Sequence, residues 1–160
     1  MLSIRHRPEA ATTLLAQWLR PRLRYDADGR FSTMLVDEAP LPQELLRVAN
    51  IVCPEVDPAL FRGVVLQGYQ HGRAVTPCHS DAPVFSFILS LGATRTFRIH
   101  RVPDGGGCSD LDALSIECVN GTALVMDEAF HAGWHHQIIP DLAVMRERLS
   151  LVFRTSPKRT

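Results

Sequence analysis

The sequence predicts a mainly β (α+β) fold, with two helices near the N-terminus and an all-β remainder. At 160 residues the chain is long enough for one domain with its own core. Before residue 61, two stretches carry apolar residues at helical spacing. After residue 61, short apolar runs are separated by Gly, Pro and Asp. We therefore expect a single domain over residues 1–160, with a helical part over 1–60 and a β core over 61–156.

The first predicted helix follows Pro8, because proline suits the first turn of a helix and Glu9 suits its N-terminal end. Its apolar stripe consists of Ala11, Leu14, Leu15, Trp18 and Leu19. The second predicted helix covers residues 43–51 and carries Leu45, Leu46, Val48 and Ala49. Between the two, Asp28-Gly29 predicts a turn, and residues 31–36 are compatible with a short strand.

The β core is predicted from seven short runs that are rich in β-branched or aromatic residues. These runs cover residues 64–69, 85–91, 94–100, 114–119, 122–126, 134–139 and 148–153. The segments Asp104–Gly107 and Asn120-Gly121 are typical of tight connections between antiparallel strands. This spacing predicts a sandwich or a partly closed barrel.

Charge and cysteine content restrict the class of protein. Seventeen basic residues balance seventeen acidic ones, so no overall charge indicates a nucleic-acid or membrane partner. The arginines gather in residues 61–103 and the acids in 104–128, which we interpret as solvated faces. We expect the four cysteines, at 53, 78, 108 and 118, to be free thiols, because they lack a C-x-x-C pair or disulfide-like spacing.

The cysteines and the apolar runs of the sequence also indicate the cellular compartment of the protein. Free thiols favour a reducing compartment, and the first residues lack an apolar signal core. No apolar run is long enough to span a bilayer. The sequence therefore predicts a cytoplasmic protein with no membrane partner.

A metal site is indicated by His79-Ser80-Asp81, because residues i and i+2 of a strand project to the same face. A third ligand must come from another strand, and the C-terminal part offers His131, His135 and His136. His135 and His136 point to opposite faces of a strand, so only one of them can coordinate, and local geometry does not choose. Two imidazoles and a carboxylate can hold Fe(II) by one face and leave the other open for a chelating acid and dioxygen. Zinc is the rival metal, but the cysteines are not spaced for a closed zinc site.

Two arginines, Arg148 and Arg154, are separated by an even number of residues and so share one face of a strand. The planar guanidinium pairs bidentately with a carboxylate, and a cation in an apolar strand is costly unless an anion meets it. The chelating acid is therefore expected to carry a second carboxylate. The alternative is that one or both arginines lie at the rim of the sheet.

In this order of motifs the chain resembles the AlkB-like branch of the Fe(II)/2-oxoglutarate dioxygenases. The matching pieces cover residues 64–154. They are Tyr69 with Gly72, His79-Ser80-Asp81, Ser90-Leu91-Gly92, Arg95 with Phe97, Leu124-Val125-Met126, Trp134-His135-His136 and the segment 148–154. The resemblance implies a double-stranded β-helix (jelly-roll) core over 61–156, with Fe(II), 2-oxoglutarate and O2 as cofactor and cosubstrates.

The resemblance also implies roles for individual residues. The third ligand, two residues after the tryptophan, would be His136, with His135 as a minor alternative because residues 137–140 make a run to the proline that is one residue longer than usual. Arg148 and Tyr69 would bind the distal carboxylate of 2-oxoglutarate, and Arg154 would lie near its metal-bound end. Gln67 stands where many members have Asn, and Ser150 where some have Asn, and both would bind the cosubstrate.

The implied reaction is oxidative demethylation of alkylated nucleobases in DNA or RNA, as in DNA repair, with a flipped or single-stranded base as partner. A stripe of Arg95, Arg98 and Arg101 supports this reading. The alternative is hydroxylation of a small molecule or a protein side chain, favoured by the short N-terminal part and by Pro83, where other members carry an acid that contacts the base. A metal-free binding module is disfavoured by the complete ligand set.

Overall fold

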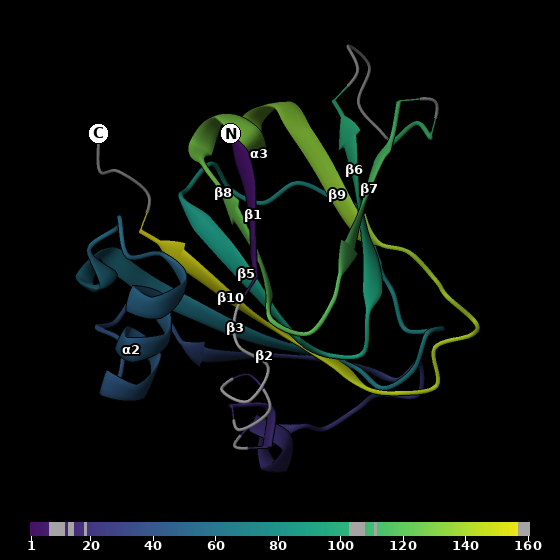
Figure 1. Ribbon diagram of the computed structural model, residues 1–160, viewed down its shortest axis with the longest axis horizontal. Helices are drawn as coiled ribbons and strands as arrows, with labels where there is room; N and C mark the ends of the chain where they lie inside the picture. Colours follow the sequence, from purple (N-terminus) through teal and green to yellow (C-terminus); the bar gives the residue numbers. More distant parts are fainter. Residues whose placement is uncertain (7–11, 13–14, 18, 103–107, 111, 157–160) are drawn as a thin grey trace.

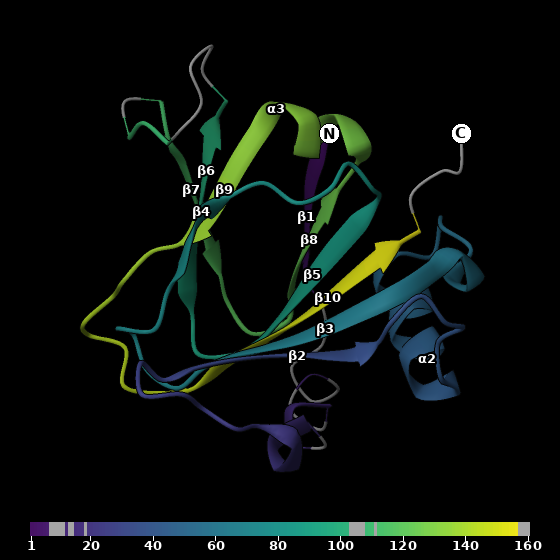
Figure 2. The same ribbon diagram turned by 180° about the vertical axis from the view of Figure 1, so that it is seen from behind.

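The computed structural model describes residues 1–6, 12, 15–17, 19–102, 108–110 and 112–156. These residues form two antiparallel sheets, drawn in Figures 1 and 2. The six-stranded sheet has the order β1-β8-β5-β10-β3-β2, and the four-stranded sheet has the order β4-β9-β6-β7. From β3 to β10 the chain passes repeatedly from one sheet to the other, which is the jelly-roll arrangement that was predicted.

The strands of the six-stranded sheet are β1 (Leu2–His6), β2 (Arg30–Val36), β3 (Phe61–Tyr69), β5 (Ser86–Gly92), β8 (Thr122–Met126) and β10 (Arg148–Thr155). The four-stranded sheet consists of β4 (Thr76–His79), β6 (Arg95–Arg101), β7 (Leu114–Cys118) and β9 (Trp134–Ile138). The helices are α2 (Gln43–Val52) and α3 (Glu128–Gly133), with short 3-10 turns η1 (Arg20–Arg22) and η2 (Pro58–Leu60).

Alternation along the central strand β10 divides the molecule into two cores. Leu149, Leu151 and Phe153 enter one hydrophobic cluster, which also contains residues of α2. Val152 enters a second cluster, with apolar residues from both sheets. Because successive strand residues point to opposite faces, the polar residues in phase with Val152 must face the space between the sheets. The alternation along β10 therefore determines that the polar residues of its inner face line the space between the two sheets.

Helix α2 covers the outer face of the six-stranded sheet near β3, as Figures 1 and 2 show. Its buried residues Leu45, Ala49 and Val52 all belong to the outer cluster. The second predicted helix is therefore confirmed. Of the first predicted helix, Thr12, residues 15–17 and Leu19 are helical, and the remaining positions lie outside the described residues.

The seven predicted strands of the core are all present, with ends displaced by a few residues at most. The predicted turn at Asn120-Gly121 is also present: Gly121 has φ +85°, a conformation that favours glycine, and Thr122 N–H donates to the Val119 carbonyl at 3.0 Å. The predicted connection at residues 104–107 lies outside the described residues.

Several elements differ from the predictions. The N-terminal part is not purely helical, because β2 confirms the short strand and β1, which was not predicted, pairs with β8. The strand expected to carry His79-Ser80-Asp81 is β4, which lies earlier and ends at His79, and helix α3 was not predicted. The prediction of four free thiols was wrong for two of them: Cys78 and Cys108 form a disulfide, whereas Cys53 and Cys118 are buried and lie outside it. Among the described residues, no helix is long and apolar enough to cross a membrane.

Candidate metal centre and cosubstrate pocket

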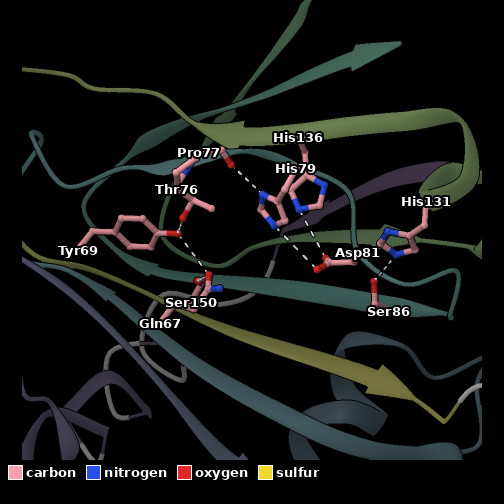
Figure 3. A network of polar contacts seen from close by, with 10 residues as sticks. All are labelled: Gln67, Tyr69, Thr76, Pro77, His79, Asp81, Ser86, His131, His136 and Ser150. Carbon is pink, nitrogen blue, oxygen red and sulfur yellow. Dashed lines mark hydrogen bonds and ion pairs between the residues drawn. The ribbon is translucent and has the colours of Figure 1, made fainter. Parts of the chain in front are cut away.

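Three predicted ligands come together between the sheets. Strands β4 and β9 are paired, and His79 stands opposite His136 in their register. Asp81 lies in the loop that follows β4, not on the strand as predicted, yet its carboxylate still meets both imidazoles (Figure 3). His79 Nε2 lies 3.8 Å from Asp81 Oδ1, and His136 Nε2 lies 3.5 Å from Asp81 Oδ2. We call His79, Asp81 and His136 the metal triad.

The imidazoles of the metal triad are held in orientations that suit coordination. His79 Nδ1 lies 2.8 Å from the Pro77 carbonyl, which can only accept, so Nδ1 carries the proton and Nε2 presents a lone pair. The His136 ring stacks on Phe97, with centroids 5.1 Å apart. Burial lowers the pKa of His136 to about 4, against the opposing effect of Asp81. His136 is therefore neutral at neutral pH, the form that binds metals.

The donor atoms of the metal triad fit a divalent cation. All three lie within 4.8 Å of one another. For bonds of about 2.1 Å at right angles, ligands on one face of an octahedron lie about 3 Å apart, so modest side-chain rotation suffices. The Nε2 lone pair of His79 and the carboxylate of Asp81 repel each other unless a cation stands between them. Two nitrogens and one carboxylate oxygen are the donor set of a non-haem Fe(II) site.

A cavity of about 240 Å³ extends from the metal triad between the two sheets. Besides the triad, it is lined by Tyr69, Gln67, Arg148, Ser150 and Arg154, all of which were predicted to bind the cosubstrate. Apolar walls come from Val65, Ile88, Phe97, Ile138 and Val152, and further lining residues are Ser32, Thr76 and Gln137. The sheet alternation thus brings every predicted site residue to one space.

Arg148 is the most unusual residue of this cavity. It is 1% exposed, and its Nη2 donates to Ser90 Oγ at 2.9 Å. Its buried Nε and Nη1 atoms have no hydrogen-bond partner. The guanidinium lies 4.9 Å from the centroid of the Tyr69 ring, a cation–π contact that compensates only part of the desolvation. A buried cation with unused donors facing a cavity is suited to bind an anion, and a carboxylate matches its planar fork.

Tyr69 belongs to a chain of hydroxyl and amide groups along one wall (Figure 3). Its hydroxyl lies 2.7 Å from Thr76 Oγ1 and 3.2 Å from Gln67 Oε1, and Ser150 Oγ donates to the same oxygen at 3.3 Å. Thr76 was not predicted as a site residue, because the strand was expected at residues 79–81 and β4 begins at Thr76. This chain fixes the Tyr69 hydroxyl at the side of the cavity that Arg148 also lines.

The sequence of this chain is similar to those of several known proteins. No family model matches the chain. It is 26% identical over 135 residues to the human protein named alpha-ketoglutarate-dependent dioxygenase alkB homolog 3, which covers 78% of this chain and 47% of that protein. It is 30% identical over 105 residues to the mouse protein of the same name, covering 59% of this chain and 36% of that protein. The matches thus span about a third to a half of the length of these relatives.

The predicted resemblance to the AlkB-like dioxygenases is therefore confirmed. Among solved structures, this chain is similar to YcfD, a ribosomal oxygenase from Escherichia coli in complex with cobalt and succinic acid. The TM-score is 0.59 at 11% identity, over 86% of this chain and 35% of that one. At this identity the likeness concerns the fold, and it confirms the predicted oxygenase-type jelly roll.

The two predictions about arginines have different outcomes. Arg154 shares the inner face of β10 with Arg148, as predicted, but it is half-buried and its Nη2 lies 3.7 Å from Met34 Sδ. The predicted stripe of Arg95, Arg98 and Arg101 was wrong, because Arg95 is 1% exposed and faces the interior. It donates to four backbone carbonyls, of His71, Gly72, Ala74 and Ile139.

The other two histidines considered as ligands lie outside the triad. His135 faces away from the cavity, where its Nδ1 lies 3.5 Å from Cys108 Sγ. His131, in α3, is buried and pairs with Ser86 Oγ at 2.8 Å, with its ring centroid 6.5 Å from that of His136. Burial lowers the pKa of His131, so this ring too is neutral near the triad. The structure therefore brings His136, and not His135, beside His79 and Asp81.

Proposed function

We propose that this protein is an Fe(II)- and 2-oxoglutarate-dependent dioxygenase. One observation carries the proposal: the buried guanidinium of Arg148, with two unused nitrogens, lines the same cavity as the metal triad. A ligand that satisfies both ends must chelate a metal at one end and present a carboxylate at the other. 2-Oxoglutarate has this chemistry, and the relatives are named as alpha-ketoglutarate-dependent dioxygenases.

In this proposal His79, Asp81 and His136 hold Fe(II), which when bound supplies the centre at which 2-oxoglutarate and O2 react. Arg148 and the Tyr69 hydroxyl bind the distal carboxylate. Gln67 and Ser150 orient the cosubstrate through the hydrogen-bonded wall that they share with Tyr69. The apolar walls limit the access of water, which strengthens the electrostatic interactions inside the cavity.

For the substrate we propose an N-alkylated nucleobase in DNA or RNA, on the strength of the AlkB-like resemblance. In the net reaction O2, 2-oxoglutarate and an N–CH3 group give N–CH2OH, succinate and CO2. The hydroxymethyl group then leaves as formaldehyde and returns a proton to the nitrogen. A target base inside a duplex must be flipped out to reach a cavity between two sheets.

The test measures succinate and formaldehyde formed from 2-oxoglutarate in the presence of Fe(II), ascorbate and air. The panel contains 1-methyladenine and 3-methylcytosine, each in DNA and in RNA oligonucleotides. Asp81→Ala is expected to abolish iron binding and turnover, because the only carboxylate of the triad is lost. Asp110→Ala is the matched control, since this aspartate is a surface partner of Arg98. Normal iron content in Asp81→Ala would contradict the site.

A second substrate class is favoured by one finding of the structure. Because Arg95 is buried, the arginine stripe that supported a nucleic-acid partner is absent from the surface. The connection between β4 and β5 covers only residues 80–85, which leaves little chain there for a substrate lid. Hydroxylation of a protein side chain or a small molecule on the same scaffold fits these features. Succinate formation that no oligonucleotide stimulates, without formaldehyde, would favour this alternative.

A further inference from the structure

A second group of potential metal ligands lies on the other face of the strands that carry the metal triad. Cys78 precedes His79 on β4, and His135 precedes His136 on β9. Because neighbours along a strand point to opposite faces, Cys78 and His135 project away from the cavity together. Cys108 joins them from the segment after β6. We call Cys78, Cys108 and His135 the outer cluster.

The contacts of the outer cluster are short. Cys78 and Cys108 are joined by the disulfide, with their Cα atoms 6.5 Å apart. Cys108 Sγ lies 3.5 Å from His135 Nδ1. The three donor atoms, two sulfurs and one nitrogen, all lie within 4.8 Å of one another. Cys108 is exposed, and Cys78 and His135 are half-buried, so the cluster is accessible from solvent.

These distances match a tetrahedral zinc site once the sulfurs are reduced. Zn–S bonds of about 2.3 Å and Zn–N bonds of about 2.0 Å place sulfur and nitrogen ligands about 3.5 Å apart, and two sulfurs about 3.8 Å apart. The sulfur–nitrogen separation already has this value. Only the sulfur–sulfur separation must grow, and breaking the disulfide permits that.

We propose that the reduced protein binds Zn²⁺ through Cys78, Cys108 and His135, at a site separate from the metal triad. The disulfide is first reduced by a dithiol, which is oxidised to its own disulfide while two electrons and two protons pass to Cys78 and Cys108. Zn²⁺ then displaces the two thiol protons and binds both thiolates and the neutral imidazole. The exposed side of the cluster leaves the fourth position to water.

The two ligand groups select different metals by their donor atoms. The metal triad offers two nitrogens and an oxygen, which suit Fe(II), whereas thiolates are soft ligands that favour zinc. The spacing of the cysteines in the sequence did not indicate such a site, because the three ligands come from separate strands and a loop. The site does not depend on the proposed oxygenase activity, since it involves none of the cavity residues.

The experiment titrates Co(II), a spectroscopic substitute for zinc, into the full chain before and after reduction by dithiothreitol and its removal. Thiolate-to-Co(II) charge-transfer absorption in the near ultraviolet arises only from sulfur ligands, so iron-site binding does not contribute. We expect the band in reduced protein, with an intensity that corresponds to one sulfur-bound Co(II) per chain once both metal sites are filled, and its absence from oxidised protein. Zn²⁺ added afterwards should displace Co(II) and abolish the band.

Variants identify the ligands. Cys78→Ser is expected to remove the band, and His135→Ala to weaken Co(II) binding at least tenfold. Cys53→Ala is the matched control, because this thiol is buried elsewhere, and it should leave the band unchanged. Absence of the band from reduced wild-type protein, or its persistence in Cys78→Ser, would overturn the proposal. Unchanged affinity in His135→Ala would also overturn it, and far-ultraviolet circular dichroism verifies that each variant is folded.

Discussion

Arg95 and Arg148 are buried to the same extent, yet their surroundings differ. Each is 1% exposed, and their guanidinium groups lie 5.7 and 4.9 Å from the centroid of the Tyr69 ring. Arg95 donates to four backbone carbonyls at 2.7–3.2 Å. Arg148 has one side-chain partner, Ser90, and two nitrogens without any.

The difference separates a structural cation from a ligand-binding one. The carbonyls around Arg95 belong to the turn that contains Gly72 and to the end of β9, which this side chain holds together. Gly72 is needed there, because a Cβ atom would lie 1.6 Å from the Asp141 carbonyl oxygen. Burial and the charge of Arg148 lower the pKa of Arg95, an unfavourable effect that the four carbonyls offset. Arg148 has no such compensation until an anion arrives.

The largest expected effect is on stability, from Arg95→Leu. Leucine removes one donor from each of four carbonyls. Those of His71 and Gly72 still accept a backbone N–H, from Ala74 and Asp141, whereas those of Ala74 and Ile139 lose the Arg95 donor, and each unsatisfied group costs about 1–3 kcal/mol. A loss of about 3–5 kcal/mol in unfolding free energy is expected, partly relieved by water, with a fall in Tm of about 6–15 °C. Thermal unfolding measures it. Arg101→Leu, the same change at an exposed position of β6, should leave Tm within about 2 °C; equal effects would contradict the comparison.

Arg148→Leu should have the opposite profile. The ligand-free protein is expected to keep or raise its Tm, because a poorly compensated buried cation has been removed. The 2-oxoglutarate requirement should rise about 30- to 100-fold, which corresponds to about 2–3 kcal/mol for a charge-assisted bidentate pair. Titration of 2-oxoglutarate with Mn²⁺ as a redox-inactive metal measures this by calorimetry. If Arg148→Leu destabilised the chain as Arg95→Leu does, both arginines would be structural.

The two arginines also show how far the sequence predicts the site. Period-two alternation placed Arg148 and Arg154 on one face, because β10 is regular and its outer face is apolar, whereas Ser150 was indicated only by the family resemblance. The same rule separates Arg95 from Arg98, yet both were assigned to one basic stripe. The charge of Arg95 did not indicate that it donates hydrogen bonds to carbonyls of residues 71–74 and 139, because these residues are distant from it in sequence.

Other predictions also failed because they depended on contacts between segments that are distant in sequence. The segment of β1 has an ordinary composition and becomes a strand only because β8 offers it a free edge. The Cys78–Cys108 disulfide depends on a contact between a short strand and a loop 30 residues away. The choice of His136 over His135 came from family resemblance, and the pairing of β4 with β9 places His136 opposite His79. Local sequence patterns thus predict which residues share one face of a strand. Pairing between strands that are distant in sequence determines which of these faces lie against each other.

A smaller effect is expected from Tyr69→Phe, which keeps the ring beside both arginines and removes only the hydroxyl. The lost contribution to carboxylate binding is about 1 kcal/mol, so the 2-oxoglutarate requirement should rise about fivefold. The same calorimetric titration measures it. Tyr25→Phe is the matched control, because its hydroxyl bonds Glu147 at 2.6 Å, outside the cavity. No change in Tyr69→Phe would assign distal carboxylate binding to Arg148 alone.

The smallest effect is expected from Arg154→Leu. Six residues of strand separate the Cα atoms of Arg154 and Arg148 by about 20 Å, so the two guanidinium groups cannot share one carboxylate without leaning far toward each other. Arg154 is also partly solvated, with Met34 Sδ as its neighbour at 3.7 Å. We therefore expect less than about a threefold rise in the 2-oxoglutarate requirement, or under about 0.7 kcal/mol. Coinciding titration curves for Arg154→Leu and Arg148→Leu would contradict the assignment of the distal carboxylate to Arg148, because a residue at the open end of β10 would then contribute as much as the buried one.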